Sequence, residues 1–419
     1  MNPETIKIPA VEEGACLLHL TGLPLVPRDT SKALFFSYPF NTTGTEQAGE
    51  EDEKVVGSFK AWPVAELFGQ PLIMKLPDGS FPEAKTGIKI IQFTGCDESK
   101  AKALMKAIAE KVPDSIFDSD NLDRGKGFIT GISLRESLRE SVRTEPEQKK
   151  LLTLFISIPH LGPAAQPLQG VLPHSKTLQE YRFMQTPAFP PTAVPDEIVR
   201  VYQTWFLLFD NDTIGIFRSE DDKLADRAPL FPFQDRRGGV QALVHMLSSS
   251  ITITERTALK DFRQKATDLE WKLWSNIQAE RTAIDRAAAA TPTEKAEAEA
   301  SLTTARSQVE FSTLLFERTM VDLSTILRLV RYQIQKLEEL LRVIQNGSMP
   351  REWNKHPRNS NPFEIDGIAH EKEQTKDAHD TLKWMVEERE KALAQINALN
   401  QDLEGVLSRV RISDLYLMR

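Results

Sequence analysis

The C-terminal third of the chain contains a repeat of apolar positions every seven residues. Steps of seven from Leu302 to Ile344 meet only apolar side chains, and a companion series four residues on runs from Met320 to Leu341. This a/d pattern predicts a long helix that buries one stripe of side chains against partner helices.

A second helix repeats the pattern from Leu382 to Val410, and only Arg389 interrupts it. A single charged residue in such a seam can set the register or lie near the rim. The residues that we expect at the helix interfaces of the two repeats are Leu323, Val330, Leu337, Ile396, Leu399, Leu403, Val406 and Val410. Two interpretations of this seam stay open, which are helix packing within one chain and an oligomeric stalk.

Residues 1–235 alternate short strand-like and helix-like patterns. Strands are expected at 16–20, 88–93, 127–132 and 151–158, the last as a buried central strand because its residues are almost continuously apolar. Asp97 or Ser99 can cap a helix that ends before Pro113. Apolar runs at 199–209 and 213–217, joined by Asp and Asn, predict a hairpin.

From Gly238-Gly239 onward the pattern is helical, with helices expected at about 240–290, 293–345 and 365–419 and with Thr293 as a cap. The predicted fold is therefore α+β. A mixed α/β sheet domain at 1–235 precedes a domain at 240–419, in which long helices form a coiled-coil-like stalk.

Composition excludes several classes of protein. The net charge of −8 argues against a nucleic-acid partner, since phosphate binding needs a basic face. Cys16 and Cys96 are the two cysteines, and we expect buried thiols in a reducing compartment. The sequence has neither a secretory signal nor a run of about 18 apolar residues, so a cytoplasmic location is expected for this chain.

Sites for chemistry are sparse in the sequence. There is no phosphate-binding glycine loop, nucleophile elbow or Cys-x-x-Cys pair, and His160 and His174 have no nucleophile beside them. We therefore do not expect an enzyme. The acidic run at 46–53 is typical of a solvated loop, and Asp210 and Asp212 are typical of a turn, with cation binding as the alternative at both places.

Three places in the middle of the chain resemble a known family. Ile156–Leu161 ends a strand, His174–Tyr181 joins a histidine to Thr-Leu and a tyrosine, and Asp196–Val199 precedes the apolar hairpin Trp205–Ile214. In this order they are similar to segments of the CorA-like divalent cation transporters in their divergent fungal form. Within the second segment, a lysine stands where arginine is usual in the family, and a glutamine stands where aspartate is usual.

The resemblance implies a pentamer whose cytoplasmic domains bind Mg²⁺ between protomers through carboxylates, the oxygen ligands that this cation prefers. The metal ligands cannot be assigned to residues of this chain. The Gly-Met-Asn pore signature and the two membrane helices of the family are absent from the sequence.

The apolar helical ending, Ile412–Arg419, predicts a continuation into a membrane span that this chain does not contain. The expected function is thus the regulatory and oligomerisation part of a CorA-like transporter. The alternative is a soluble helical scaffold or interaction protein with the same fold and no transport activity.

Overall fold

The computed structural model describes residues 6–9, 25–26, 29, 31–39, 55–69, 72–82, 87–108, 116–125, 128–139, 149–163, 175–184, 199–209, 212–230, 238–346 and 371–417. Several predictions lie outside these ranges. They concern the strand at 16–20 with Cys16, the acidic run at 46–53, His174, Asp210 and the family-like residues 196–198.

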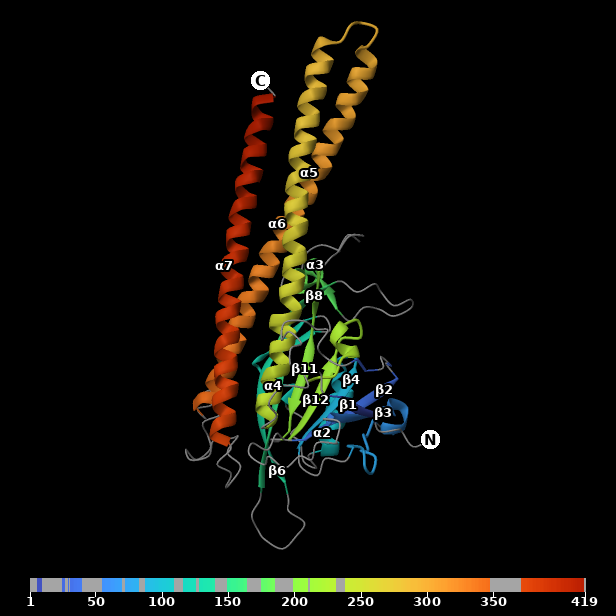
Figure 1. The fold of residues 1–419 in the computed structure, drawn as a ribbon, viewed down its shortest axis with the longest axis vertical. Helices are drawn as coiled ribbons and strands as arrows, with labels where there is room; N and C mark the ends of the chain where they lie inside the picture. The colour runs from blue at the N-terminus through green and yellow to red at the C-terminus, as the bar shows by residue number, and fades with distance from the viewer. Residues whose placement is uncertain are drawn as a thin grey trace.

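A nine-stranded mixed sheet organises the N-terminal half (Figure 1). Its spatial order is β1-β3-β2-β4-β12-β11-β7-β6-β5. All neighbours are antiparallel except β4 and β12, which pair in parallel through Lys89–Thr94 and Thr213–Arg218. The strands are β1 Ile6–Pro9, β2 Lys32–Pro39, β3 Val55–Pro63, β4 Gly87–Thr94, β5 Leu122–Gly125, β6 Phe128–Arg139, β7 Lys149–Ser157, β11 Thr204–Leu208 and β12 Thr213–Arg218.

Both faces of this sheet are covered. Side chains alternate between the faces, so in β12 Ile216 packs on one side and Phe217 on the other. The helices α1 (Val64–Leu67) and α2 (Glu98–Ile108) contribute to the core that contains Phe217. Asp97 caps α2 by accepting hydrogen bonds from the backbone N–H groups of Ser99 and Lys100. It was one of the two residues predicted as a cap for this helix.

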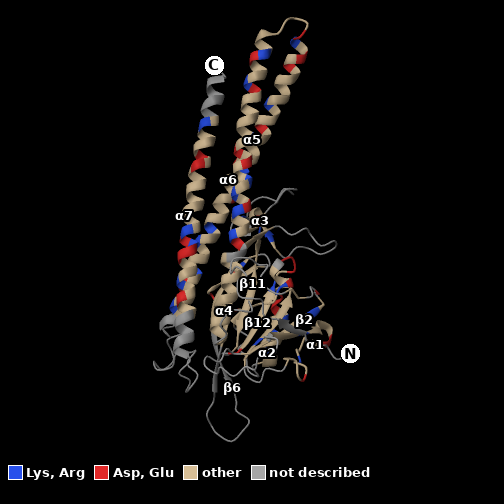
Figure 2. Ribbon diagram, viewed as in Figure 1, with Lys and Arg blue, Asp and Glu red and all other residues tan. Residues whose placement is uncertain are grey.

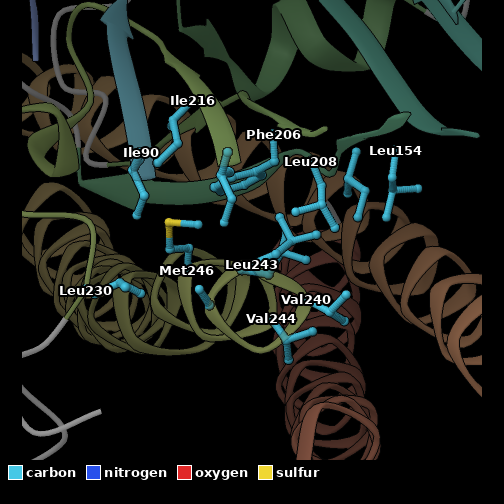
Figure 3. Packing of buried hydrophobic residues seen from close by; sticks show 14 of the residues in the cluster. Ile90, Leu154, Phe206, Leu208, Ile216, Leu230, Val240, Leu243, Val244 and Met246 are labelled. Carbon is cyan, nitrogen blue, oxygen red and sulfur yellow. The ribbon is translucent and has the colours of Figure 1, made fainter. Parts of the chain in front are cut away.

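The opposite face packs on α4 (Gly239–Ser248) and on parts of the long helices. Figure 3 shows Leu243 and Met246 of α4 directed toward Phe206 and Ile216 of the sheet. Leu337 and Leu382, which belong to two other helices, lie in the same apolar cluster. The sheet and the helices therefore share one continuous core.

The remaining helices are long. They are α5 Glu255–Ala289, α6 Lys295–Asn346 and α7 Glu371–Leu417. At 1.5 Å per residue, the 52 residues of α6 span about 78 Å. Helices α5 and α6 form an antiparallel hairpin that extends well beyond the sheet, and α7 runs alongside α6 (Figure 1). Acidic and basic residues occur along all three helices (Figure 2).

A small second sheet connects the two halves of the molecule. It contains β8 (His160–Pro163), β10 (Val199–Tyr202) and β9 (Lys176–Thr177) in that spatial order, followed by α3 (Leu178–Met184). Its residues Leu161 and Val201 pack in a cluster with residues of α5, α6 and α7.

Three details of the sequence interpretation were wrong. The run 199–209 is two strands, β10 and β11, in two different sheets, separated at Gln203. The helix expected at 240–290 contains a π-helical turn at Ser249–Thr254. Thr293 is not the N-cap of α6, because the helix begins at Lys295 and its first backbone hydrogen bond runs from the N–H of Ala298 to the carbonyl of Glu294.

The broad expectations agree with the structure. Mixed α/β architecture with a large sheet precedes long C-terminal helices, and the strands predicted at 88–93, 127–132 and 151–158 correspond to β4, β6 and β7. Among the helices that the structure describes, none combines the length and apolar composition that a membrane crossing requires.

Candidate functional site

A buried carboxylate joins four separate segments of the chain. Glu255 is the first residue of α5, and its side chain is fully buried. It follows directly after the π-helical turn, where the hydroxyls of Ser249, Ser250 and Thr252 bond to carbonyls four residues earlier. Such hydroxyl bonds compete with the regular backbone ladder and accompany local changes in helical winding.

Every contact of this carboxylate is to a different element. Its Oε1 accepts hydrogen bonds from the backbone N–H of Leu161 at 2.6 Å and from Nε2 of Gln333 at 2.5 Å. Its Oε2 accepts from Nη1 of Arg389 in α7. Gln333 in α6 also donates to the carbonyl of Pro159 at 2.8 Å. We call Glu255, Gln333, Arg389 and the turn Pro159–Leu161 the junction.

The two buried charges of the junction, on Glu255 and Arg389, each require the other to be stable. Burial raises the pKa of Glu255, against the opposing effects of Arg389 and the hydrogen bonds. Arg389 is only 3% exposed, and its Nε has no hydrogen-bond partner among the described residues. Since a buried charge without a counter-charge is strongly unfavourable, each residue of the pair compensates the other.

A second buried polar group lies next to the junction along the chain. His160 belongs to the same turn as Pro159 and Leu161, and its Nε2 is 3.7 Å from Oδ2 of Asp222. Nη1 of Arg218 is also 3.7 Å from that oxygen, and all three side chains are buried. Burial acts to raise the pKa of Asp222, but His160 and Arg218 outweigh it, so that this pKa stays below its ordinary value.

This second group brings chemically reactive residue types near one another, and Cys96, for which a buried thiol was expected, is only partly buried. Cys96 is the free cysteine of the described ranges, and its Sγ donates to the carbonyls of Phe217 and Gln203. Burial raises the pKa of the Cys96 thiol, which opposes the thiolate form that nucleophilic chemistry needs. Ser175 is bonded to Asp221 through its backbone N–H and its hydroxyl. The histidine itself is held loosely, since both ring nitrogens of His160 lack a hydrogen-bond partner among the described residues.

The predicted interface residues occupy the helical part of the structure. Leu323, Val330, Ile396, Leu403, Val406 and Val410 are buried in one cluster formed by α5, α6, α7 and the small sheet, and Leu399 packs at its edge. Leu337 lies in the other cluster, beneath the nine-stranded sheet. The structure thus brings seven of these residues together within a single chain and places the eighth one apart.

The sequence pattern singled out Arg389 of the junction but did not indicate Glu255 or Gln333. Arg389 was conspicuous as the one charged residue in the α7 seam, and it lies inside the seam and not at a rim. Glu255 and Gln333 carry no such mark, because a polar residue in an amphipathic helix is ordinarily exposed. The described residues contain no group of three or more His, Cys, Asp or Glu side chains that could hold a metal ion.

Comparison with protein-family models and with curated proteins gave no match for this chain. The resemblance to CorA-like transporters therefore stays a prediction from the segments described above.

Proposed function

We propose that this chain is the regulatory part of a CorA-like divalent cation transporter. In this proposal the sheet domain senses a cation, and α7 transmits the response as a stalk in a homo-oligomer. The order of parts supports it, since a mixed sheet domain precedes a long helical hairpin and then α7.

The junction is the observation that carries the proposal. The Glu255 carboxylate ties the β7–β8 turn, α5, α6 and α7 to one buried point. A displacement of the sheet domain would change the geometry at this point and so alter the position of α7. Packed interiors respond to such changes by moving between discrete arrangements and not by gradual deformation.

A scaffold or interaction protein with no transport role is the second candidate. One observation favours it, which is that the seam residues of α7, such as Leu403 and Val406, are already covered within one chain. A stalk that assembles with copies of itself would need a further contact surface on α7.

The test is the absolute mass of the protein by light scattering, first in excess Mg²⁺ and then in excess chelator. A cation sensor of this type gives an oligomer in Mg²⁺ that loosens on chelation, whereas an unchanged monomer favours the scaffold. Hydrogen exchange of α7 in both conditions provides a second readout. The variant Arg389→Met separates sensing from transmission, because it should retain the change in mass but lose the exchange response of α7.

A further inference from the structure

A cleft of about 440 Å³ opens between α5 and α7 and lies beside the junction. Helices α5 and α7 both pack along α6 but scarcely touch one another, so a space remains between them. The lining of the cleft spans Arg256 to Arg263 on α5 and Glu388 to Leu399 on α7, and Leu323 of α6 also contributes to it. Its volume falls within the range of about 300–1,000 Å³ that is typical of small-molecule sites.

The lining of the cleft has two chemical parts. The apolar part consists of Leu259, Phe262, Leu323, Ala392, Ile396 and Leu399. The charged part contains five basic residues and one acidic residue, namely Arg256, Lys260, Arg263, Arg389, Lys391 and Glu388. This local excess of positive charge contrasts with the net charge of −8 of the whole chain.

The ion pairs leave part of this positive charge uncompensated. Glu388 pairs with Arg256 at 3.1 Å and with Lys391 at 3.0 Å. Within the ranges that the structure describes, Lys260 and Arg263 have no acidic partner, and both side chains are exposed. Their charges are therefore available to a ligand.

Arg389 is a second and independent indication of a ligand. It is buried to 3% exposure and lines the cleft, and its Nε donor lacks a partner among the described residues. A buried donor without an acceptor is unfavourable, so an acceptor that reached it from the cleft would stabilise this side chain.

We propose that this cleft binds a small amphipathic anion. A carboxylate or phosphate head would lie near Lys260, Arg263 and Arg389, and an alkyl chain would cover the apolar side chains of Phe262, Ile396 and Leu399. Charge complementarity selects an anionic head, and the apolar lining selects a tail.

A helix from a protein partner fits the cleft less well than a small molecule. The lining covers the eight residues Arg256 to Arg263 of α5 and the twelve residues Glu388 to Leu399 of α7, which correspond to about 10 Å and about 16 Å of helix. A stable protein interface usually buries about 800 Å² on each partner, which a cleft of this length does not offer. An acidic helical peptide is nevertheless included as an arm of the test.

Occupation of the cleft has a consequence for the junction, whichever proposed function holds. An anionic head beside Arg389 would compete with Glu255 for the same guanidinium, because both need its N–H donors. Ligand binding would thus weaken the contact between α7 and the β7–β8 turn.

The test is calorimetric titration of the intact chain with dodecanoate and with dodecyl phosphate, both below their micelle concentrations. Inorganic phosphate and dodecyltrimethylammonium provide the head without the tail and the tail with the opposite charge. We expect at least one anionic amphiphile to bind at least tenfold more tightly than either control. The comparison of dodecanoate with dodecyl phosphate identifies the preferred head.

Three variants locate the binding. The double variant Lys260→Gln/Arg263→Gln should weaken it at least tenfold, and Ala392→Trp should abolish it by filling the cleft. Lys272→Gln, an exposed lysine of α5 outside the cleft, should leave it unchanged. The exposed Lys260 and Arg263 can be changed without affecting the core, so the test does not depend on the folding of Ala392→Trp.

Three results would overturn the proposal. One is equal binding of the anionic and cationic amphiphiles, and another is binding that the double variant leaves intact. The third is tight binding of an acidic helical peptide without binding of either anionic amphiphile.

Discussion

Removal of the positive charge at the junction should destabilise the protein strongly. The variant Arg389→Met retains most of the side-chain volume but leaves Glu255, which is fully buried, without its counter-charge. The carboxylate would keep its hydrogen bonds from Leu161 N–H and Gln333 Nε2, so part of the compensation remains. The lost bond to a charged group accounts for about 1.5–3 kcal/mol, and with the unpaired charge the total reaches about 3–5 kcal/mol.

A double-mutant cycle separates the pair from its surroundings. Glu255→Gln removes the negative charge and keeps a carbonyl oxygen that can accept from Leu161. We expect Glu255→Gln/Arg389→Met to be at least about 2 kcal/mol more stable than the sum of the two single effects predicts, because neither charge is left unpaired. The assay is urea denaturation at pH 7, followed by circular dichroism.

The pH dependence provides an internal check. Because burial raises the pKa of Glu255 above its ordinary value of 4.5, its contribution to stability is fully present below about pH 4.5 and is lost as the pH rises through the folded-state pKa. Without Arg389 that pKa rises further, so Arg389→Met should recover stability relative to wild type when the pH falls from 7 to 5. Additive single effects, or an Arg389→Met penalty that does not change with pH, would refute the reasoning about the junction.

Three further predictions concern separate parts of the molecule. Leu403→Asp places a charge in a buried position of α7 and should lower the free energy of unfolding, measured by denaturation, by about 3–5 kcal/mol. The control Gln401→Asp on the exposed face should change it by less than about 0.5 kcal/mol. Equal effects of the two variants would place the seam at the surface. Burial raises the pKa of Asp322 from 3.8 to about 6, so its stabilising contribution disappears as the pH rises past 6. The free energy of unfolding of Asp322→Asn should therefore match that of wild type at pH 4 and exceed it by about 2–3 kcal/mol at pH 8. An identical difference at both pH values would contradict this expectation. Gly131→Ala should cost at least about 2 kcal/mol of stability because φ is +134° and a Cβ would lie 2.5 Å from the carbonyl of Asn121. Gly405→Ala in α7, where a Cβ would meet nothing within 4 Å, should instead gain about 0.5–1 kcal/mol. The melting temperatures of the two variants measure this contrast, and a lower melting temperature in both would disprove it.

Patterns that depend on local repeats were predictable from the sequence. The heptads located α6 and α7, and the nearly continuous apolar run at 151–158 located β7, because these signals reside in neighbouring residues. The strand switch at Gln203 was not predictable, since an apolar run does not specify which sheet each half joins. In the structure β10 pairs with β8 while β11 pairs with β7 and β12.

The junction could be predicted only in part, for a similar reason. Arg389 breaks an apolar seam and so indicates a special environment, but its partner Glu255 is 134 residues away in the sequence. Glu255 follows the cluster of hydroxyl residues at 248–254, and the sequence of this cluster did not predict that it forms a π-helical turn. A pairing over this distance is fixed by tertiary packing, and spacing within one helix carries no information about it.

The single parallel pair in the large sheet has a consequence for the order of synthesis. Strands β1 to β4 come from residues 6–94, yet β4 gains its partner β12 only at residues 213–218. During translation, the edge of β4 with Ile88, Ile90 and Ile91 remains without its partner until more than 100 further residues have been made. Ala378 and Met385 of α7 complete the core beneath that sheet. The nascent chain therefore exposes an aggregation-prone strand edge over a long interval, and it should depend on chaperones until α7 has emerged.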